Sequence, residues 1–339
     1  MSSLKIPRTI EWVDGKVRIL NQLKLPYKLE YIETSSYKRV IRAIKKMEIR
    51  GAPAIGVATA YGLALAVTKI RIKNLEKALK KLNSIAKEFM ESRPTAYNLF
   101  WAVNKILDAA KTAKNVDDLK DIVVKKALEI ARLDEECNRK IGEYGEKLIK
   151  DGGRVLTICN AGSLATSYYG TATAPMYRAW EKGKRFEVIV METRPYLQGA
   201  RLTAFELKQA GIPVKVITDN MIGIVMRKIK IDLVVTGADR VTKDGYVINK
   251  IGTFPLSLVA REFSVPFYVA APFSTIDFNS TIDDVKIEER DPKEMLYIFG
   301  KRIVPEGVGG IYFAFDITPP DLVTGLITEK GIYKLPIKI

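Results

Sequence analysis

From residue 154 onward the chain alternates short apolar runs with longer segments of helical periodicity, and this alternation restricts the fold more than any other feature. Apolar runs bounded by turns are typical of strands buried in a parallel sheet. Repeated strand–helix units predict a mainly parallel sheet with helices on both faces, as in Rossmann-like folds. The expected strands lie at residues 154–158, 186–191, 214–218, 232–235 and 267–271, and the clearest helices at 199–210 and 253–263.

The first part of the chain has a different pattern. Residues 9–20 alternate around Asp14-Gly15, a pair typical of a tight β-hairpin. Helical periodicity follows, with a break at Arg93 because Pro94 disfavours helical geometry there. The expected helices lie at 37–48, 54–69, 74–90, 96–112 and from 116 onward. We therefore predict an α/β fold: a small helical N-terminal domain with an N-terminal β-hairpin, residues 1–127, and a Rossmann-like, mainly parallel C-terminal domain, residues 128–339.

The chain contains no histidine and only two cysteines, Cys137 and Cys159. Histidine is the usual proton carrier near neutral pH and the commonest metal ligand, and a structural zinc site takes about four Cys or His ligands. We therefore expect no metal site, and acid–base chemistry that relies on Asp, Glu, Lys, Tyr or Cys. The scarcity of cysteine, with no recognisable signal peptide, predicts a reducing, cytoplasmic environment.

The formal net charge of +16 admits two interpretations. A basic surface can indicate nucleic acid, but the lysines are spread over expected helices such as 74–90, and no aromatic-rich RNA-binding motif occurs. We favour a solvated basic surface and an anionic small substrate, without a nucleic-acid partner. The apolar run at residues 52–67 falls short of the ~20 residues that span a membrane, so we expect a buried helix there and no membrane partner.

Two polar loops follow two of the expected strands. One is Cys159-Asn160-Ala161-Gly162, and the other is Gly237-Ala238-Asp239-Arg240. Because the carboxyl ends of strands border the ligand crevice of an open α/β sheet, these loops can bring a thiol and a carboxylate to one substrate. The dinucleotide-binding and Walker A fingerprints are absent, which argues against a dehydrogenase or a nucleotide hydrolase. The loops predict proton-transfer chemistry on a small molecule.

Each reactive side chain also has a structural interpretation. Cys159 is expected just before a helix, whose N-terminus would lower the pKa of its thiol, but a free cysteine can also be a small buried apolar residue, as we expect for Cys137. Desolvation after an apolar strand would raise the pKa of Asp239 and suit a general acid. Alternatively, Asp239 caps a turn or pairs with Arg240.

Further segments could bind an anion. Arg50-Gly51-Ala52-Pro53 joins two expected helices, so an arginine and free amides at a helix start lie together. Arg93 could reach the same anion, and Asn249-Lys250, in an expected loop before the helix at 253, could bind phosphate or sugar hydroxyls. The structural alternatives are a surface arginine and an ordinary turn.

Taken together, these motifs make the chain resemble the methylthioribose-1-phosphate isomerases, which share a superfamily with the regulatory subunits of translation initiation factor 2B and with ribose-1,5-bisphosphate isomerase. The resemblance covers nearly the whole chain. The segments that carry it are residues 9–12, 49–56, 92–96, 159–162, 192–195, 198–204, 218–221, 237–240, 249–253 and 328–331.

The resemblance implies conversion of the aldose 5-methylthioribose 1-phosphate to the ketose 5-methylthioribulose 1-phosphate in methionine salvage. It implies Asp239 as proton donor and Cys159 as the group that assists the transition state. It also implies a homodimer without metal or organic cofactor. The implied substrate-binding residues are Arg50, Gly51, Ala52, Arg93, Gln198, Asn249 and Lys250.

One position departs from the family, and two other functions compete. Many relatives have histidine before the cysteine, where this chain has Ile158, so no role for such a histidine carries over. A non-catalytic regulatory subunit would have no reason to keep Cys159, Asp239, Arg50 and Arg93 together. A ribose-1,5-bisphosphate isomerase would need more cationic contacts for its second phosphate. Related 5-deoxy-pentose 1-phosphates, and proton or hydride transfer between C2 and C1, stay open.

Overall fold

The structure is a computed structural model that describes residues 4–93 and 96–337. Its contacts divide the chain into two compact units. The N-terminal unit comprises residues 7–137 and 163–170; the C-terminal unit comprises residues 4–6, 138–162 and 171–337. The predicted break at Pro94 falls outside the described residues.

The division differs from the expected boundary after residue 127, for two physical reasons. Helix α5 (Val116–Gly145) continues past that point, and its side chains up to Ala131 still pack into the core of the N-terminal unit. The chain then returns to that unit at residues 163–170, where the Ser163 carbonyl accepts a 2.7 Å hydrogen bond from Thr9 Oγ1.

The N-terminal unit begins with the predicted hairpin. Strands β1 (Ile10–Val13) and β2 (Lys16–Leu20) pair antiparallel around a two-residue turn in which both Asp14 and Gly15 have positive φ. Positive φ at both central residues is the geometry that matches the twist of a hairpin. A third strand, β3 (Tyr31–Thr34), pairs with β2 and was not predicted.

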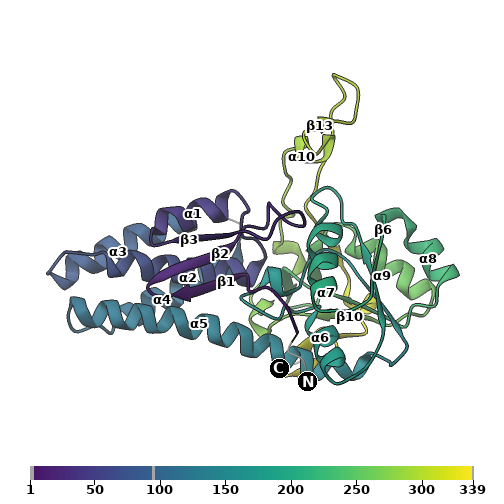
Figure 1. The fold of residues 1–339 in the computed structure, drawn as a ribbon, viewed down its shortest axis with the longest axis horizontal. Coiled ribbons are helices and arrows are strands. Elements are labelled where there is room, and N and C mark those ends of the chain that lie inside the picture. Colours follow the sequence, from purple (N-terminus) through teal and green to yellow (C-terminus); the bar gives the residue numbers. More distant parts are fainter. Residues whose placement is uncertain (1–3, 94–95, 338–339) are drawn as a thin grey trace. The chain divides into compact units, whose positions relative to one another are not determined.

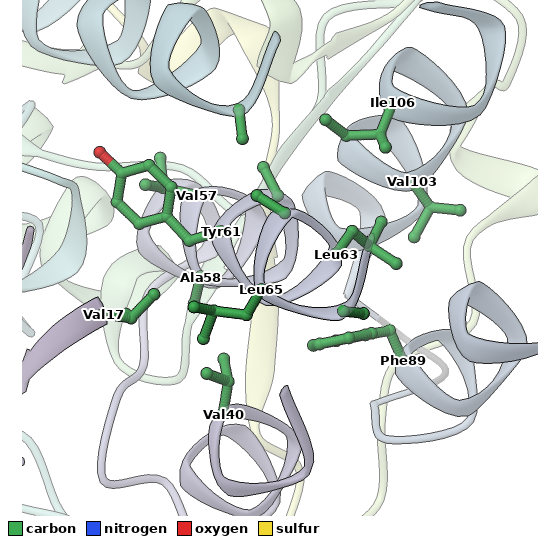
Figure 2. Packing of buried hydrophobic residues seen from close by; sticks show 14 of the residues in the cluster. Val17, Val40, Val57, Ala58, Tyr61, Leu63, Leu65, Phe89, Val103 and Ile106 are labelled. Carbon is green, nitrogen blue, oxygen red and sulfur yellow. The ribbon is translucent and has the colours of Figure 1, made fainter. Parts of the chain in front are cut away.

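Helix α2 (Ala52–Thr68) forms the centre of this unit. It is apolar on every side, as expected of a helix that other elements surround. The apolar side chains around it come from the hairpin and from neighbouring helices, as Figure 2 shows for Val17, Val40, Phe89, Val103 and Ile106. The other helices of the unit are α1 (Tyr37–Lys45), α3 (Leu75–Met90), α4 (Tyr97–Ala110) and the first part of α5.

A seven-stranded sheet organises the C-terminal unit (Figure 1). The strand order is β16-β15-β10-β7-β4-β5-β6, parallel except for the edge strand β16. The mainly parallel sheet is thus confirmed. Its strands are β4 (Arg154–Thr157), β5 (Glu187–Met191), β6 (Val214–Ile217), β7 (Leu233–Thr236), β10 (Phe267–Ala270), β15 (Gly325–Thr328) and β16 (Gly331–Tyr333), of which the last two were not predicted.

Short helices connect these strands. Helix α8 (Ile222–Lys228) and helix α9 (Thr253–Glu262) bury Val225 and Leu256 against strand residues such as Leu156 and Val234. Residues 199–210, expected as one helix, form a π-helical turn, η3 (Gly199–Thr203), followed by α7 (Ala204–Gln209). The remaining pieces are α6 (Ala174–Glu181) and the 3-10 turns η1 (Glu146–Leu148), η2 (Ser163–Ala165), η4 (Asp219–Met221), η5 (Phe273–Thr275), η6 (Ile282–Asp284) and η7 (Pro320–Leu322).

A second, four-stranded sheet lies in the same unit in the order β11-β8-β9-β14. Its strands are β11 (Ile276–Asp277), β8 (Arg240–Thr242), β9 (Val247–Lys250) and β14 (Phe315–Thr318). The expectation that Asn249 and Lys250 lie in a loop is therefore wrong, because β9 pairs with both β8 and β14. Between β11 and β14 an arm projects from the unit with α10 (Lys293–Leu296), β12 (Tyr297–Ile298) and β13 (Lys301–Arg302), as Figure 1 shows.

No helix in the described parts of the chain is long and apolar enough to cross a membrane. Residues 52–67, expected as a buried helix, are the body of α2, and residues 54–67 are all buried.

A buried carboxylate joins the second sheet to helix α9. Asp316 lies opposite Asn249 in the β14–β9 pair, and its Oδ2 accepts hydrogen bonds from the backbone N–H groups of Gly252 (2.7 Å) and Phe254 (3.1 Å) at the start of α9. Burial raises the pKa of Asp316 to about 6, although those amides and the charge of Lys250 act in the opposite direction. The helix start thus depends on a carboxyl group that is costly to ionise.

The glycine in the middle of α2 gives a test of core packing. A Cβ added at Gly62 would overlap the ring of Phe89, which has no exposed surface. Alanine is the better helix former by about 1 kcal/mol, but overpacking a core costs about 1–3 kcal/mol. We expect Gly62→Ala to lower the free energy of unfolding by up to about 2 kcal/mol, measured by urea denaturation.

The matched control is Gly223→Ala in helix α8, where an added Cβ meets nothing within 4 Å. This variant should gain about 0.4–1 kcal/mol. Equal gains in both variants would show that α2 tolerates the extra methyl group.

The carboxyl group of Asp316 predicts a pH dependence of stability. Because its pKa is raised to about 6 in the folded protein, the folded state binds more protons than the unfolded state from about pH 4 to pH 6. Its contribution is present below the unfolded pKa and is lost as the pH rises through the folded pKa. The stability of Asp316→Asn relative to the parent should therefore rise over this window by about 2 kcal/mol, measured by urea denaturation; a difference independent of pH would contradict this.

Candidate active site

The order of the seven-stranded sheet reverses at β4. From this strand the chain passes through β5 to β6 on one side, then crosses to β7 on the other side of β4. Such a reversal opens a crevice outside the carboxyl ends of the two central strands, which is where ligands bind in this architecture. The Cys159 loop follows β4 and the Asp239 loop follows β7, so both predicted catalytic side chains begin at the switch point.

Two glycines let the loops at this edge approach each other closely. A Cβ added at Gly237 would lie 2.5 Å from Cβ of Ala161, so the Asp239 loop contacts the Cys159 loop directly. A Cβ added at Gly252 would lie 2.9 Å from Cδ1 of Ile158. The segment after Lys250 therefore packs against the residue that precedes Cys159. Three loops, from β4, β7 and β9, meet at one place.

Cys159 is held in an unusual backbone conformation. It is a partly buried cysteine outside any disulfide, with φ of 62°, in the left-handed region that non-glycine residues rarely adopt. Its N–H donates to Oγ1 of Thr193 at 2.8 Å, and its carbonyl accepts from Oγ1 of Thr203 at 2.6 Å. Both of its backbone polar groups are thus fixed by threonine side chains, one after β5 and one in η3.

The expected helix directly after Cys159 is absent. Gly162 is followed by the single 3-10 turn η2, and the next α-helix, α6, begins at Ala174. The carbonyls of Ser163 and Leu164 instead accept hydrogen bonds from the side chains of Thr9 and Gln22, which are distant in sequence. The proposed lowering of the thiol pKa by a helix N-terminus therefore has no structural basis.

The loop after Cys159 encloses a buried carboxylate. The side-chain amide of Asn160 donates to Glu206 and, at 3.1 Å, to Oγ1 of Thr203. Glu206 has no exposed surface, and a Cβ at Gly162 would overlap its carboxylate. Gly162 is therefore required by Glu206, which the sequence analysis did not single out.

Asp239 is partly buried and anchored through its backbone. Its N–H donates to the carbonyl of Ile248 on β9 at 2.9 Å. The neighbouring Arg240 forms an ion pair with Asp277, with Nη1 and Oδ2 3.8 Å apart. Burial would raise the pKa of Asp277, but hydrogen bonds from Asn279 and Ser280 and the charge of Arg240 lower it.

Asn249 connects the ends of three elements. Its buried side-chain amide donates to Oγ1 of Thr236 at the end of β7 (2.7 Å) and to Oγ1 of Thr253 at the start of α9 (2.9 Å). Lys250 follows on β9, with its ammonium group 4.4 Å from the centroid of the Phe315 ring. The hydrogen bonds of Asn249 therefore hold the end of β7, where the Asp239 loop begins, next to the end of β9, where Lys250 lies.

Gln198 presents a buried polar atom at the carboxyl end of β5. The residue is 6% exposed and precedes η3. Its Oε1 has no hydrogen-bond partner among the described residues. A buried acceptor without a partner costs free energy unless a ligand or water satisfies it, so Gln198 suits the binding of a hydroxyl group.

The remaining predicted residues belong to the N-terminal unit. Gly51 caps the start of α2 with φ of 93°, and a Cβ there would overlap Ala165 of the same unit. Ala52 is the first helical residue of α2, so Arg50 directly precedes the start of a helix. Arg93 is partly buried and directly precedes the residues that the structure does not describe.

Sequence reasoning missed the residues that support Cys159. Thr193 lies in the segment Glu192-Thr193-Arg194-Pro195, and Thr203 lies in residues 198–204; both segments carried the family resemblance, but neither threonine had an assigned role. Thr193 lies just after an expected strand, which was the available signal for it, whereas Thr203 lies inside the helix expected at residues 199–210. Among the described residues, no group of three or more acidic, cysteine or histidine side chains could hold a metal ion.

This chain matches a known protein family over most of its length. The model of the initiation factor 2 subunit family matches residues 48–335. A methylthioribose-1-phosphate isomerase of Geobacillus kaustophilus (strain HTA426) is 49% identical over 335 residues, which cover 98% of this chain and 94% of that protein.

Two solved structures have the same fold over 98% of this chain. The 5-methylthioribose 1-phosphate isomerase from Pyrococcus horikoshii OT3 is 40% identical with a TM-score of 0.92, and 94% of it is covered. A structure described as translation initiation factor eIF-2B, subunit delta, from A. fulgidus is 45% identical with a TM-score of 0.89, and 97% of it is covered. The chain therefore belongs to the initiation factor 2 subunit family and, within it, to the methylthioribose-1-phosphate isomerases.

Proposed function

We propose that this protein is an aldose–ketose isomerase that converts 5-methylthioribose 1-phosphate to 5-methylthioribulose 1-phosphate, a step of methionine salvage. Near full-length similarity to isomerases of that name supports the reaction. The observation that carries the proposal is the contact between the Cys159 and Asp239 loops at the switch point of the sheet.

The substrate sets a specific chemical problem. A phosphate on C1 prevents the sugar ring from opening simply to a free aldehyde. The reaction therefore needs an acid that protonates the ring oxygen, after which hydrogen moves between C2 and C1. We assign the acid role to Asp239, since its partly buried carboxyl group follows β7 and its backbone is anchored to β9.

Cys159 is assigned to the hydrogen transfer. As a thiolate it would take the C2 proton of the ring-opened cation to give a C1–C2 enol, which becomes the ketose when C1 takes up a proton and the C2 hydroxyl loses one. In a dry apolar site a hydride would pass directly from C2 to C1 while Cys159 assists the transition state. Ile158 is only 1% exposed and belongs to the apolar core. The chain thus has a core side chain where many relatives have histidine.

The substrate-binding assignments follow the resemblance and fit the observed chemistry. The amide of Asn249 is bonded to Thr236 and Thr253, so at this edge of the sheet Oε1 of Gln198 and Oδ1 of Asn249 offer acceptors and Lys250 offers a cation. Arg50, Gly51, Ala52 and Arg93 of the N-terminal unit complete the proposed set.

Three finer points are part of the proposal. We expect a homodimer in the cytoplasm, on the family resemblance and the few free cysteines. The methylthio substrate is preferred over ribose 1,5-bisphosphate because a second phosphate would require further cations. A regulatory role is the second candidate, favoured by the structure described as a subunit of eIF-2B.

Removal of the acid tests the reaction. We expect the purified protein to isomerise 5-methylthioribose 1-phosphate and Asp239→Asn to lose at least ~10²-fold in kcat, because an amide cannot protonate the ring oxygen. The assay follows ketose formation, with ribose 1,5-bisphosphate as a parallel substrate. The control is Asp321→Asn, since Asp321 pairs with Arg261 on an exposed surface.

The outcomes distinguish the candidate functions. Turnover of only the bisphosphate would change the substrate assignment. No turnover of either sugar phosphate by the parent protein would favour the regulatory role. An active Asp239→Asn variant would exclude this residue as the proton donor.

Replacement of the thiol tests the hydrogen-transfer step. Cys159→Ser should lower kcat by at least ~10²-fold with KM nearly unchanged, because the side chain acts in the transition state. Cys137→Ser, in helix α5, is the matched control and should keep full turnover. Near-normal kcat in Cys159→Ser would remove this residue from the mechanism.

The same assay in D₂O separates the two routes. A thiolate base exchanges its proton with solvent, so deuterium would enter C1 of the ketose. Direct hydride transfer would leave C1 free of solvent deuterium.

A further inference from the structure

A set of hydrogen bonds around Cys159 has no role in the reaction proposed above. Beyond Thr193 Oγ1, which accepts the Cys159 N–H, the set continues to a carboxylate. The N–H of Thr193 donates to Oδ1 of Asp219 at 2.8 Å, and the N–H of Arg194 donates to Oδ2 at 2.7 Å. Asp219 opens the turn η4 directly after β6. The bonds therefore link the ends of β4, β5 and β6.

Both residues in the middle of this chain of contacts are conformationally strained. Thr193 has φ of 67° and Cys159 has φ of 62°. A β-branched residue in the left-handed region is a genuine outlier, and such a conformation persists only where its surroundings impose it. The surroundings here are explicit: Thr193 has no exposed surface, its hydroxyl donates to the Met191 carbonyl at 3.0 Å, and its N–H is held by a carboxylate.

We propose that Asp219 and Thr193 are positioning residues that hold Cys159 in its left-handed conformation for catalysis. Asp219 fixes the backbone of Thr193, and Thr193 fixes the backbone of Cys159. The inference rests on the role proposed for Cys159 in the isomerase reaction. Neither residue contacts substrate in this scheme; both act through the orientation of the thiol.

The hydroxyl of Thr193 has a dual hydrogen-bonding role that limits its replacements. It donates to Met191 while accepting from Cys159. Serine can make both bonds, whereas valine keeps the shape and makes neither. Asparagine in place of Asp219 keeps the size, but only one of its two terminal atoms can accept an N–H. Thr193→Val and Asp219→Asn therefore break successive links, and Thr193→Ser keeps them.

A matched control lies at the opposite edge of the same strands. Asp151 precedes β4, and its Oδ1 accepts the backbone N–H of Arg185, just before β5, at 2.6 Å. Asp151→Asn therefore weakens the same kind of carboxylate–backbone bond at the amino ends of the strands, away from the proposed site.

Two readouts separate positioning from general destabilisation. The first is steady-state kinetics: Thr193→Val and Asp219→Asn should lower kcat by ~10- to 100-fold with KM changed less than ~twofold, since a misplaced group costs about this much. The second is alkylation of both cysteines by iodoacetamide, with the two rates resolved by peptide mass spectrometry. Cys137 serves as an internal reference because it is a partly buried cysteine in helix α5, outside this set of hydrogen bonds.

We expect Cys159 to react at least ~threefold faster relative to Cys137 in both variants, because a loosened loop exposes the thiol. Thr193→Ser and Asp151→Asn should match the parent in both readouts. Global unfolding would instead accelerate both cysteines together; if Thr193→Val behaves so, Asp219→Asn decides the question.

The proposal fails if Asp219→Asn and Thr193→Val keep the parental kcat and the parental ratio of alkylation rates. It also fails if Thr193→Ser loses as much kcat as Thr193→Val. A parent protein without isomerase activity would refute the proposed function, while a shifted ratio of rates in the variants would still establish the positioning of Cys159.

Discussion

The close approach of backbone segments at the carboxyl edge of the sheet is the constraint on which the candidate site depends. Gly237 lies where a side chain would collide with Ala161, and Gly252 lies where one would press on Ile158. Because packed interiors give way little to added volume, the loops after β4, β7 and β9 can meet only if both positions lack a Cβ. The absence of a side chain at Gly237 and Gly252 thus allows the Cys159 loop, the Asp239 loop and Lys250 to lie close together.

Hydrogen bonds then hold in place the loops that these glycines allow to approach each other. Asn249 ties the end of β7 to the start of α9, and Asp316 binds the first amides of α9 from the opposite strand. Each of these hydrogen bonds resists displacement of the elements that it joins, since breaking it leaves a donor or an acceptor unsatisfied. The rigidity of this edge therefore comes from a small number of buried side chains that join separate elements.

The elements that sequence reasoning could predict are those whose signal is local. Apolar runs specified five strands of the large sheet, and Asp14-Gly15 specified the hairpin, since both depend on neighbouring residues. The sheet containing β9 could not be predicted, because its short strands include Asn249 and Lys250 and are stabilised by partners distant in sequence. The prediction of a helix after Cys159 was wrong for the same reason: the carbonyls of Ser163 and Leu164 accept hydrogen bonds from side chains distant in sequence.

Cys159 and Thr193 have left-handed backbone conformations, and the question is whether the fold or the chemistry requires them. Ile158 is buried in the core at the end of β4, and the side chain of Cys159 packs against the same core. A residue that leaves a strand ordinarily stays in the extended or right-handed region. Instead, Cys159 and Thr193 both adopt left-handed geometry, at a cost of about 1–3 kcal/mol each. Strained conformations of this kind are concentrated at sites where they orient a reactive group, so these two residues support a working thiol at Cys159 independently of the fold.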